Sequence, residues 1–245
     1  SKKAQVTLFV IIAILLVSAI VLVFFLKGAA LKNYFGRESK EVSVLSREVK
    51  IVKNHIDNCL ETSLEETVFI NSLQGGYYQI PHNLEVNFKD SELFNPIPYY
   101  FIYGESFVPS KNSLEEQISL GVSNEIRDCL NFSRFSFDAQ YSLEGMDVEA
   151  LIEEEKINLN VVFPVSVRVD DSVSLLEEFE IKVDSDYLSF YNLAVDLTEE
   201  QEKHPDSFCV SCMDGFSDKY NLEISTTEVF DGSDYIIVYS LKKDI

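Results

Sequence analysis

The residues of this sequence best suited to chemistry are four cysteines, Cys59, Cys129, Cys209 and Cys212. Cys209 and Cys212 stand three positions apart, a spacing that suits thiol–disulfide exchange, metal binding or a local disulfide. A thioredoxin-like redox pair normally opens a helix after a strand, whereas this pair follows His204-Pro205-Asp206 outside any such pattern. A zinc site would require two further ligands, which Cys59 and Cys129 could supply.

Structural disulfides are the interpretation that we favour for these cysteines, because a small, even number of cysteines suits an oxidising compartment. Four cysteines allow three pairings, and the sequence alone does not choose among them. We favour Cys59 with Cys129, which would tie a long helix to the rest of the domain. Cys209 would then pair with Cys212 in a short local loop. We therefore expect neither a metal nor a cofactor.

Other catalytic patterns are not found in the sequence. His55, His82 and His204 lie in unrelated segments, and no catalytic triad order, phosphate loop or dinucleotide motif occurs. Glu153-Glu154-Glu155 and Glu199-Glu200 lack the regular spacing of a calcium loop, so we interpret them as solvated faces. The sequence predicts no catalytic residue and no enzyme activity.

The charge of the chain is strongly acidic and unevenly distributed. The formal net charge is −21, and the first acidic residue is Glu38. From Gly28 onward there are 41 acidic and 17 basic residues, because three of the 20 bases, Lys2, Lys3 and Lys27, come earlier. Such a surface repels the phosphates of nucleic acids, so we exclude them as partners.

An apolar segment lies near the start of the chain, where the sequence from Val6 to Leu26 has no charge, no Gly and no Pro. As a helix it would be about 30 Å long, the thickness of the hydrocarbon core of a bilayer. A cleaved secretory signal usually has a shorter apolar region that ends in a small-residue cleavage site. Here the small residue, Ala4, precedes the apolar run. We therefore predict that the segment is retained.

The residues before this segment resemble the class III signal peptides of archaeal type IV pilins and archaellins. Lys2 and Lys3 precede Ala4-Gln5, and the apolar run follows directly. The resemblance implies cleavage between Ala4 and Gln5, and a helix that sits in membrane lipid before it joins a filament core. Phe9 stands where bacterial-type pilins carry a glutamate. The residues assigned to this helix include Val6, Leu8, Phe9, Val10, Ile11, Leu15, Leu16, Phe24 and Phe25.

Three further stretches accompany this start: Cys59-Leu60-Glu61-Thr62, Leu73-Gln74-Gly75-Gly76-Tyr77-Tyr78 and Phe208-Cys209-Val210-Ser211-Cys212. The combination is similar to a family of pilin-like surface proteins from small-genome, host-associated archaea. The resemblance implies a structural subunit of an extracellular type IV pilus-like filament, which serves adhesion or cell–cell contact. Its partners would be further copies of itself and another cell surface. The alternatives are a non-polymerising, membrane-anchored binding module and a surface thiol oxidoreductase.

The predicted fold class is α+β, with a long N-terminal hydrophobic helix (a pilin-like stalk) and then a globular antiparallel β-sheet domain with flanking helices. Residues 1–36 would form the leader and the membrane or filament-core helix. Residues 37–245 would form an extracellular acidic domain. Asn131-Phe132-Ser133 is a glycosylation sequon, which has meaning if this domain is exported.

Periodicity predicts the elements of this domain. An apolar stripe predicts a helix over 40–74 that ends at Gly75-Gly76, and Ser113-Leu114-Glu115-Glu116 is typical of a capping box that opens a helix to Cys129. Alternation predicts a strand over Ile157–Val169, with Pro164 at an edge or bulge, and a returning strand through Phe179, Ile181 and Val183. Helices are predicted over 186–203 and 205–219, and a hairpin over 221–227 and 235–241.

Overall fold

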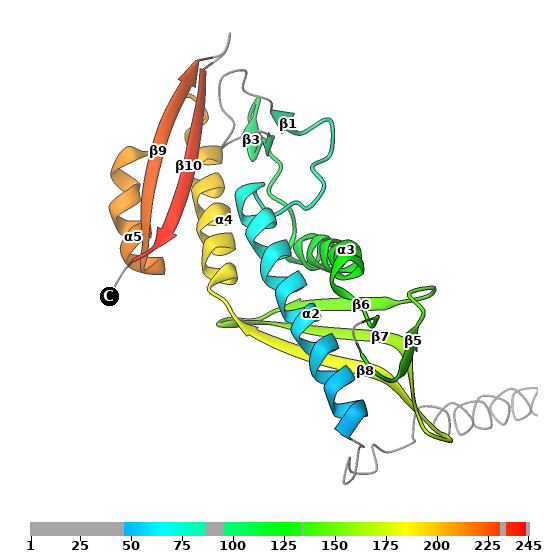
Figure 1. The fold of residues 1–245 in the computed structure, drawn as a ribbon. Coiled ribbons are helices and arrows are strands. Elements are labelled where there is room, and N and C mark those ends of the chain that lie inside the picture. The colour runs from blue at the N-terminus through cyan, green and yellow to red at the C-terminus, as the bar shows by residue number, and fades with distance from the viewer. Residues whose placement is uncertain (1–46, 87–95, 134, 231–233, 244–245) are drawn as a thin grey trace, which may run out of the picture. The chain divides into compact units, whose positions relative to one another are not determined.

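The chain divides into two units, Ser1–Ser46 and Arg47–Ile245. The computed structural model describes residues 47–86, 96–133, 135–230 and 234–243, all in the second unit (Figure 1). The elements in chain order are α2 (Arg47–Leu73), β1 (Glu85–Val86), β2 (Ile97–Pro98), β3 (Phe101–Ile102), β4 (Glu105–Ser106), α3 (Lys111–Cys129), β5 (Asp138–Tyr141), β6 (Asp147–Ile152), β7 (Lys156–Val169), β8 (Ser172–Asp184), α4 (Tyr187–Lys203), the 3-10 helix η1 (Val210–Cys212), α5 (Met213–Tyr220), β9 (Leu222–Phe230) and β10 (Asp234–Lys242).

The main sheet is built around β7, and all of its pairings are antiparallel. β8 pairs along the full length of β7, while β6 pairs with residues 157–162 and β5 with residues 165–168. The predicted alternation of β7 is confirmed, because Ile157, Leu159, Val161, Phe163, Val165 and Val167 are all buried. The β7–β8 register shifts between Val162 and Val165, so the predicted bulge at Pro164 is also confirmed.

α2 covers one face of this sheet, where it packs against β7 and β8 (Figure 1). Its buried apolar residues recur three or four positions apart, which is the spacing of one helix face. These residues are Val49, Val52, Ile56, Cys59, Leu60 and Leu64. The helix ends at the predicted Gly75-Gly76, where both residues have positive φ angles of 58° and 86°. The structure thus describes the predicted helix from Arg47 onward.

α3 packs beside α2 and completes an edge of the sheet. The Ser119 hydroxyl accepts a hydrogen bond from Ala150 N at 3.0 Å, and the Glu115 carboxylate accepts one from Ile152 N at 2.9 Å. These bonds satisfy amides of β6 that no neighbouring strand takes up. The capping-box prediction was wrong, because the helix begins three residues earlier with Ser110 as its N-cap. Glu115, the residue before the expected capping glutamate Glu116, binds the sheet edge.

The C-terminal elements form a second layer. α4 contacts β3, β4 and α5, and α5 lies against β9 of the β9–β10 hairpin. Asp196 of α4 accepts hydrogen bonds from Lys219 at 2.5 Å and from Tyr220 at 2.7 Å, both on α5. Desolvation raises the pKa of Asp196, but these two hydrogen bonds outweigh it and leave the pKa below its ordinary value. The predicted helix over 205–219 was wrong in its first half, since helical structure begins only at Val210.

The predicted fold class needs a correction. The antiparallel α+β domain is present, but the long N-terminal hydrophobic helix that was to lead into it is not found among the described residues. The first described helix, α2, is amphipathic, and its apolar face belongs to the core of the domain. None of the helices in the described ranges has both the length and the apolar character required to cross a membrane. The residues assigned to the filament-core helix, Val6 to Phe25, lie outside the described residues.

Candidate functional site

The four cysteines form two disulfides, in the pairing that we favoured from the sequence. Cys59 bonds to Cys129 with a Cα–Cα distance of 5.6 Å, and Cys209 bonds to Cys212 with a Cα–Cα distance of 5.4 Å. No cysteine of the chain is free. The zinc alternative that recruited Cys59 and Cys129 as ligands for the second pair is therefore wrong, because those two cysteines bond to each other.

The Cys59–Cys129 disulfide lies at the contact between α2 and α3. Cys59 is 1% exposed, and it joins the middle of α2 to the last residue of α3. The His55 ring, one turn away on α2, lies 3.9 Å from Cys59 Sγ and edge-on to Phe132 at 5.8 Å and to Phe135 at 5.5 Å. Cys59 is buried and Cys129 is half-buried, so we interpret this bond as a structural crosslink.

The Cys209–Cys212 disulfide is a surface feature. It lies in η1, between a loop that follows α4 and the start of α5, and the intervening Val210 is 69% exposed. The pair does not open a helix after a strand, which is the setting of thioredoxin-like redox centres. The sulfurs are partly accessible, so this bond is open to chemistry that Cys59–Cys129 does not offer.

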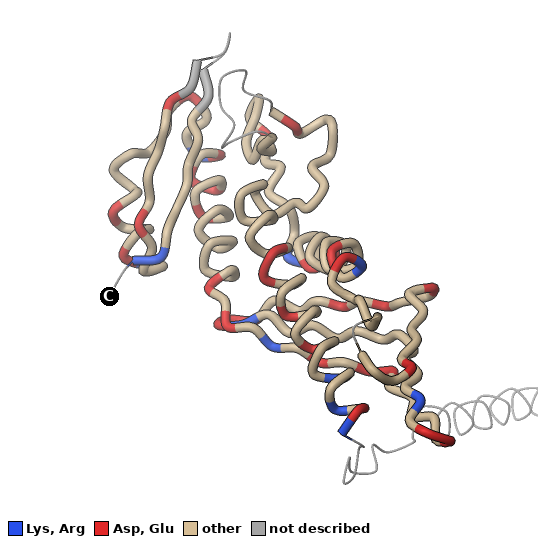
Figure 2. The backbone as a smooth tube through the Cα atoms, viewed as in Figure 1, with Lys and Arg blue, Asp and Glu red and all other residues tan. Residues whose placement is uncertain are grey.

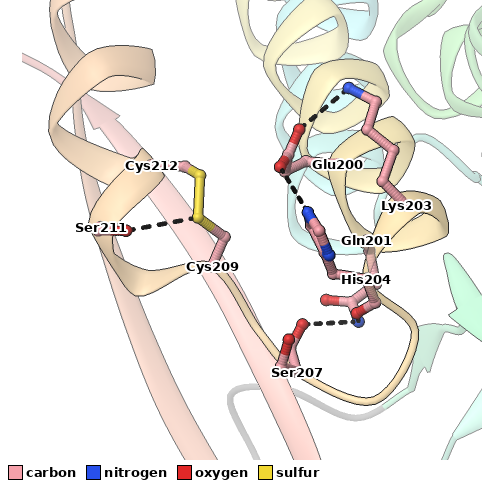
Figure 3. Close-up of polar contacts among 8 residues, drawn as sticks. All are labelled: Glu200, Gln201, Lys203, His204, Ser207, Cys209, Ser211 and Cys212. Carbon is pink, nitrogen blue, oxygen red and sulfur yellow. Dashed lines mark hydrogen bonds and ion pairs between the residues drawn. A yellow bond between two sulfur atoms is a disulfide. The ribbon is translucent and has the colours of Figure 1, made fainter.

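Glu200 faces this disulfide from the last turn of α4, and His204, the residue after the helix, points its ring toward Glu200 (Figure 3). The Sγ atoms of Cys209 and Cys212 and a carboxylate oxygen of Glu200 all lie within 4.8 Å of one another. His204 Nε2 lies 3.8 Å from Glu200 Oε1, and Lys203 Nζ donates to Glu200 Oε2 at 3.0 Å. The hydrogen bond to Glu200 is the main cause of a raised pKa for Lys203. The carboxylate thus stands between a cation, an imidazole and two sulfurs.

Gln201 positions the loop that connects these groups. Its side-chain amide donates to the carbonyl oxygens of His204 at 3.0 Å, Pro205 at 3.4 Å and Ser207 at 3.3 Å. His204 N and Ser207 N add backbone bonds to Gln201 O and His204 O. Three acceptors on one amide fold the loop back over the end of α4, and this brings Cys209 toward Glu200.

Sequence reasoning missed Glu200 and His204 as members of this cluster. Their spacing of four places both on one side of a helix, and the cysteine pair follows within nine residues. We had interpreted Glu199-Glu200 as a solvated face and His204 as an isolated histidine. The signal was the order Glu-x3-His-x4-Cys-x2-Cys, which becomes informative once α4 is seen to end at Lys203.

No protein-family model, curated protein or solved structure matches this chain.

The remaining predicted site residues are separate from this cluster. Asn131 is exposed after α3, and its Oδ1 accepts bonds from Ser133 N at 3.0 Å and Ser133 Oγ at 2.6 Å. The sequon is therefore at the surface, where a glycan would be accommodated. Ala4 and Gln5, the predicted cleavage site, lie outside the described residues.

An open cavity of about 620 Å³ lies between α3, the end of β6 and α4. Lys111, Glu153, Glu154 and Ser189 contribute polar groups to its wall, and Ile152 and Leu188 contribute apolar ones. The lining holds neither histidine nor cysteine, so it offers no nucleophile–base pair of the usual kind.

Proposed function

We propose that this chain is a structural subunit of a surface filament of the type IV pilus-like class, and that the described domain is displayed outside the cytoplasm. The observation that carries the external placement is the buried Cys59–Cys129 disulfide. A structural disulfide is typical of proteins that fold in an oxidising compartment. The described domain contributes a stable, crosslinked body to the subunit.

The surface of the domain agrees with this proposal. Figure 2 shows acidic residues on helices, strands and turns of the described chain, with fewer basic residues among them. The chain carries a net charge of −21 and all of its acidic residues lie from Glu38 onward, so copies of the domain repel one another and stay soluble at high local density. Subunits would then associate through the uncharged segment from Val6 to Leu26, because its apolar side chains are stabilised by burial away from water.

The test is fractionation of cells that produce the full chain. Shearing should release the protein in filaments visible by immunogold electron microscopy, and mass spectrometry should find a mature N-terminus at Gln5. Leu15→Lys should abolish recovery in the sheared fraction, because a charge in the apolar segment opposes its burial. Leu15→Ile is the matched control and should assemble normally. Both variants should retain the two disulfides of the domain, which separates assembly from folding.

The second candidate is a membrane-anchored binding module that does not polymerise. Four exposed apolar residues favour it. Leu151, Val173 and Leu175 pair with even-numbered residues of β7, and Val162 is itself one of these, so all four lie on the face opposite the buried odd-numbered residues of β7. Such residues suit contact with another protein. Recovery of the chain only in membranes, with none in the sheared fraction, would reject the filament and favour this candidate.

A further inference from the structure

The end of α4 and η1 bring together side chains whose donor atoms are those of a metal site. Glu200 and His204 offer one oxygen and one imidazole nitrogen, and Cys209 and Cys212 offer two sulfurs. Zinc in proteins is bound by thiolate, imidazole and carboxylate groups, normally four in a tetrahedron. The set is complete within 13 consecutive residues, 200–212, so no distant element has to contribute a ligand.

We propose that, when the Cys209–Cys212 disulfide is reduced, Glu200, His204, Cys209 and Cys212 bind one zinc ion. The disulfide and zinc forms exclude each other, since each sulfur can bond either to its partner or to the metal. This proposal does not depend on filament assembly. It concerns the described domain alone and gives the exposed cysteine pair a function that the buried pair cannot have.

The chemistry balances in two steps. A dithiol reductant supplies two electrons and two protons, which cleave the sulfur–sulfur bond and yield two thiols while the reductant becomes a disulfide. Zn²⁺ then displaces two protons as two thiolates bind it. Oxidation by a disulfide-forming catalyst reverses both steps and releases the metal.

Reduction allows the two bonded sulfurs to move apart, and the Glu200 and His204 side chains must then close on them. With zinc–ligand bonds of roughly 2.0–2.3 Å, ligand atoms in a tetrahedral site lie about 3.5 Å apart. Both sulfurs and a Glu200 oxygen already lie within 4.8 Å of one another. The His204 side chain is 61% exposed, so its ring can turn toward the sulfurs without displacing the core.

The surrounding contacts suit a bound zinc. Two thiolates and one carboxylate exceed the charge of Zn²⁺ by one, and Lys203 supplies a compensating positive charge at the other oxygen of Glu200. Hydrogen bonds that fix a ligating carboxylate are a regular part of metal sites. Gln201 holds the loop that carries His204 and sets its distance from η1.

The test uses the full chain after mild reduction, with alkylation and mass spectrometry to show that Cys209 and Cys212 are free and Cys59–Cys129 is intact. Titration with zinc against a chromophoric chelator should give one ion per reduced chain. Cobalt(II) in its place should give the thiolate charge-transfer and intense visible bands of a tetrahedral sulfur site. The oxidised chain and the Cys209→Ser/Cys212→Ser variant should bind neither metal at this stoichiometry.

Single variants then identify the other two ligands. Glu200→Gln and His204→Ala should each weaken zinc binding at least tenfold and alter the cobalt spectrum, with the circular dichroism unchanged. Glu199→Gln and His82→Ala are matched controls, because Glu199 neighbours the site in sequence and His82 lies in a different part of the fold; both should bind as the wild type does. Wild-type affinity in Glu200→Gln and His204→Ala would overturn the proposal, as would a reduced wild-type chain that binds no zinc.

Discussion

Cys59 in the middle of α2 is bonded to Cys129 at the end of α3, and this single bond joins residues 70 positions apart in the sequence. The two helices pack against each other. α2 also packs against β7 and β8, and α3 packs against β6. The bond therefore closes the largest covalent loop in the described domain around its hydrophobic core. Its contribution to the free energy of unfolding should be much larger than that of Cys209–Cys212, which joins residues only three positions apart.

Removing the buried disulfide should lower the free energy of unfolding substantially. The loss expected from chain entropy is about 4 kcal/mol for a loop of this length in Cys59→Ala/Cys129→Ala. The same reasoning gives about 1.5 kcal/mol for Cys209→Ser/Cys212→Ser, which serves as the control. Urea denaturation followed by circular dichroism measures both. Equal losses in the two variants would contradict the assignment of one bond to the core and the other to the surface.

Gly121 of α3 lies directly against Thr67 of α2. A Cβ atom at this position would lie 2.3 Å from Thr67 Cγ2 and 2.9 Å from Tyr78 Cδ2. Gly121→Ala should therefore destabilise the domain by about 1–3 kcal/mol, because the helices must separate to admit a methyl group. Thr67→Ala in the same chain should recover part of the loss, and a double-mutant cycle measures this coupling. Additive effects would show that the two residues do not meet.

The Thr67 hydroxyl is buried and has no hydrogen-bond partner among the described residues. Thr67→Val keeps the shape and removes that hydroxyl, so stability should be unchanged or increased by up to about 1 kcal/mol. Thr198→Val is the matched control, since the buried Thr198 hydroxyl donates to Ala194 O at 2.8 Å. That variant should lose about 1 kcal/mol in thermal or urea denaturation. A clear loss in Thr67→Val would mean that its hydroxyl is bonded after all.

Asp196 should make the attachment of α5 to α4 sensitive to acid. Its pKa is lower in the folded chain than the ordinary 3.8, so the folded state favours the ionised form. The resulting stabilisation is present above pH 3.8 and disappears as the pH falls through the lower folded pKa. Asp196→Asn should reduce the thermal midpoint at neutral pH and flatten its decline below pH 3.8. Asp171→Asn, at the exposed β7–β8 turn, removes the same charge from a site outside the α4–α5 contact and serves as the control variant.

Hydrophobic periodicity was sufficient to predict the central elements of the domain. The three- and four-residue spacing from Val49 to Leu60 and the alternation from Ile157 to Val169 each reflect burial on one face, and both elements are confirmed. The C-terminal hairpin is confirmed as well, with β9 and β10 paired from Leu222–Lys242 to Phe230–Asp234. These patterns involve residues that are close together in the sequence, so they can be recognised without knowledge of the fold.

Other features depend on contacts between distant segments and left no local pattern. β5 is only four residues long and is held in the sheet by pairing with β7, so the residues Asp138–Tyr141 alone do not predict a strand. The spacing from Ser113 to Glu116 is that of a capping box, and nothing in it indicates that the neighbouring Glu115 accepts a hydrogen bond from the amide of Ile152 across the fold. The Glu200–His204–Cys209–Cys212 cluster depends on where α4 ends and how Gln201 folds the following loop.

The order of segments along the chain also constrains how the domain reaches its native state. α2 is synthesised well before β8, the strand that lies against its apolar side. Until β7 and β8 have been made, the apolar face of α2 lacks the sheet that covers it in the folded domain. A nascent copy therefore exposes apolar surface that chaperones can bind and through which neighbouring copies can aggregate. During the same interval Cys59 could form a disulfide with a cysteine other than Cys129. Folding should no longer depend on chaperones once β8 has packed against α2.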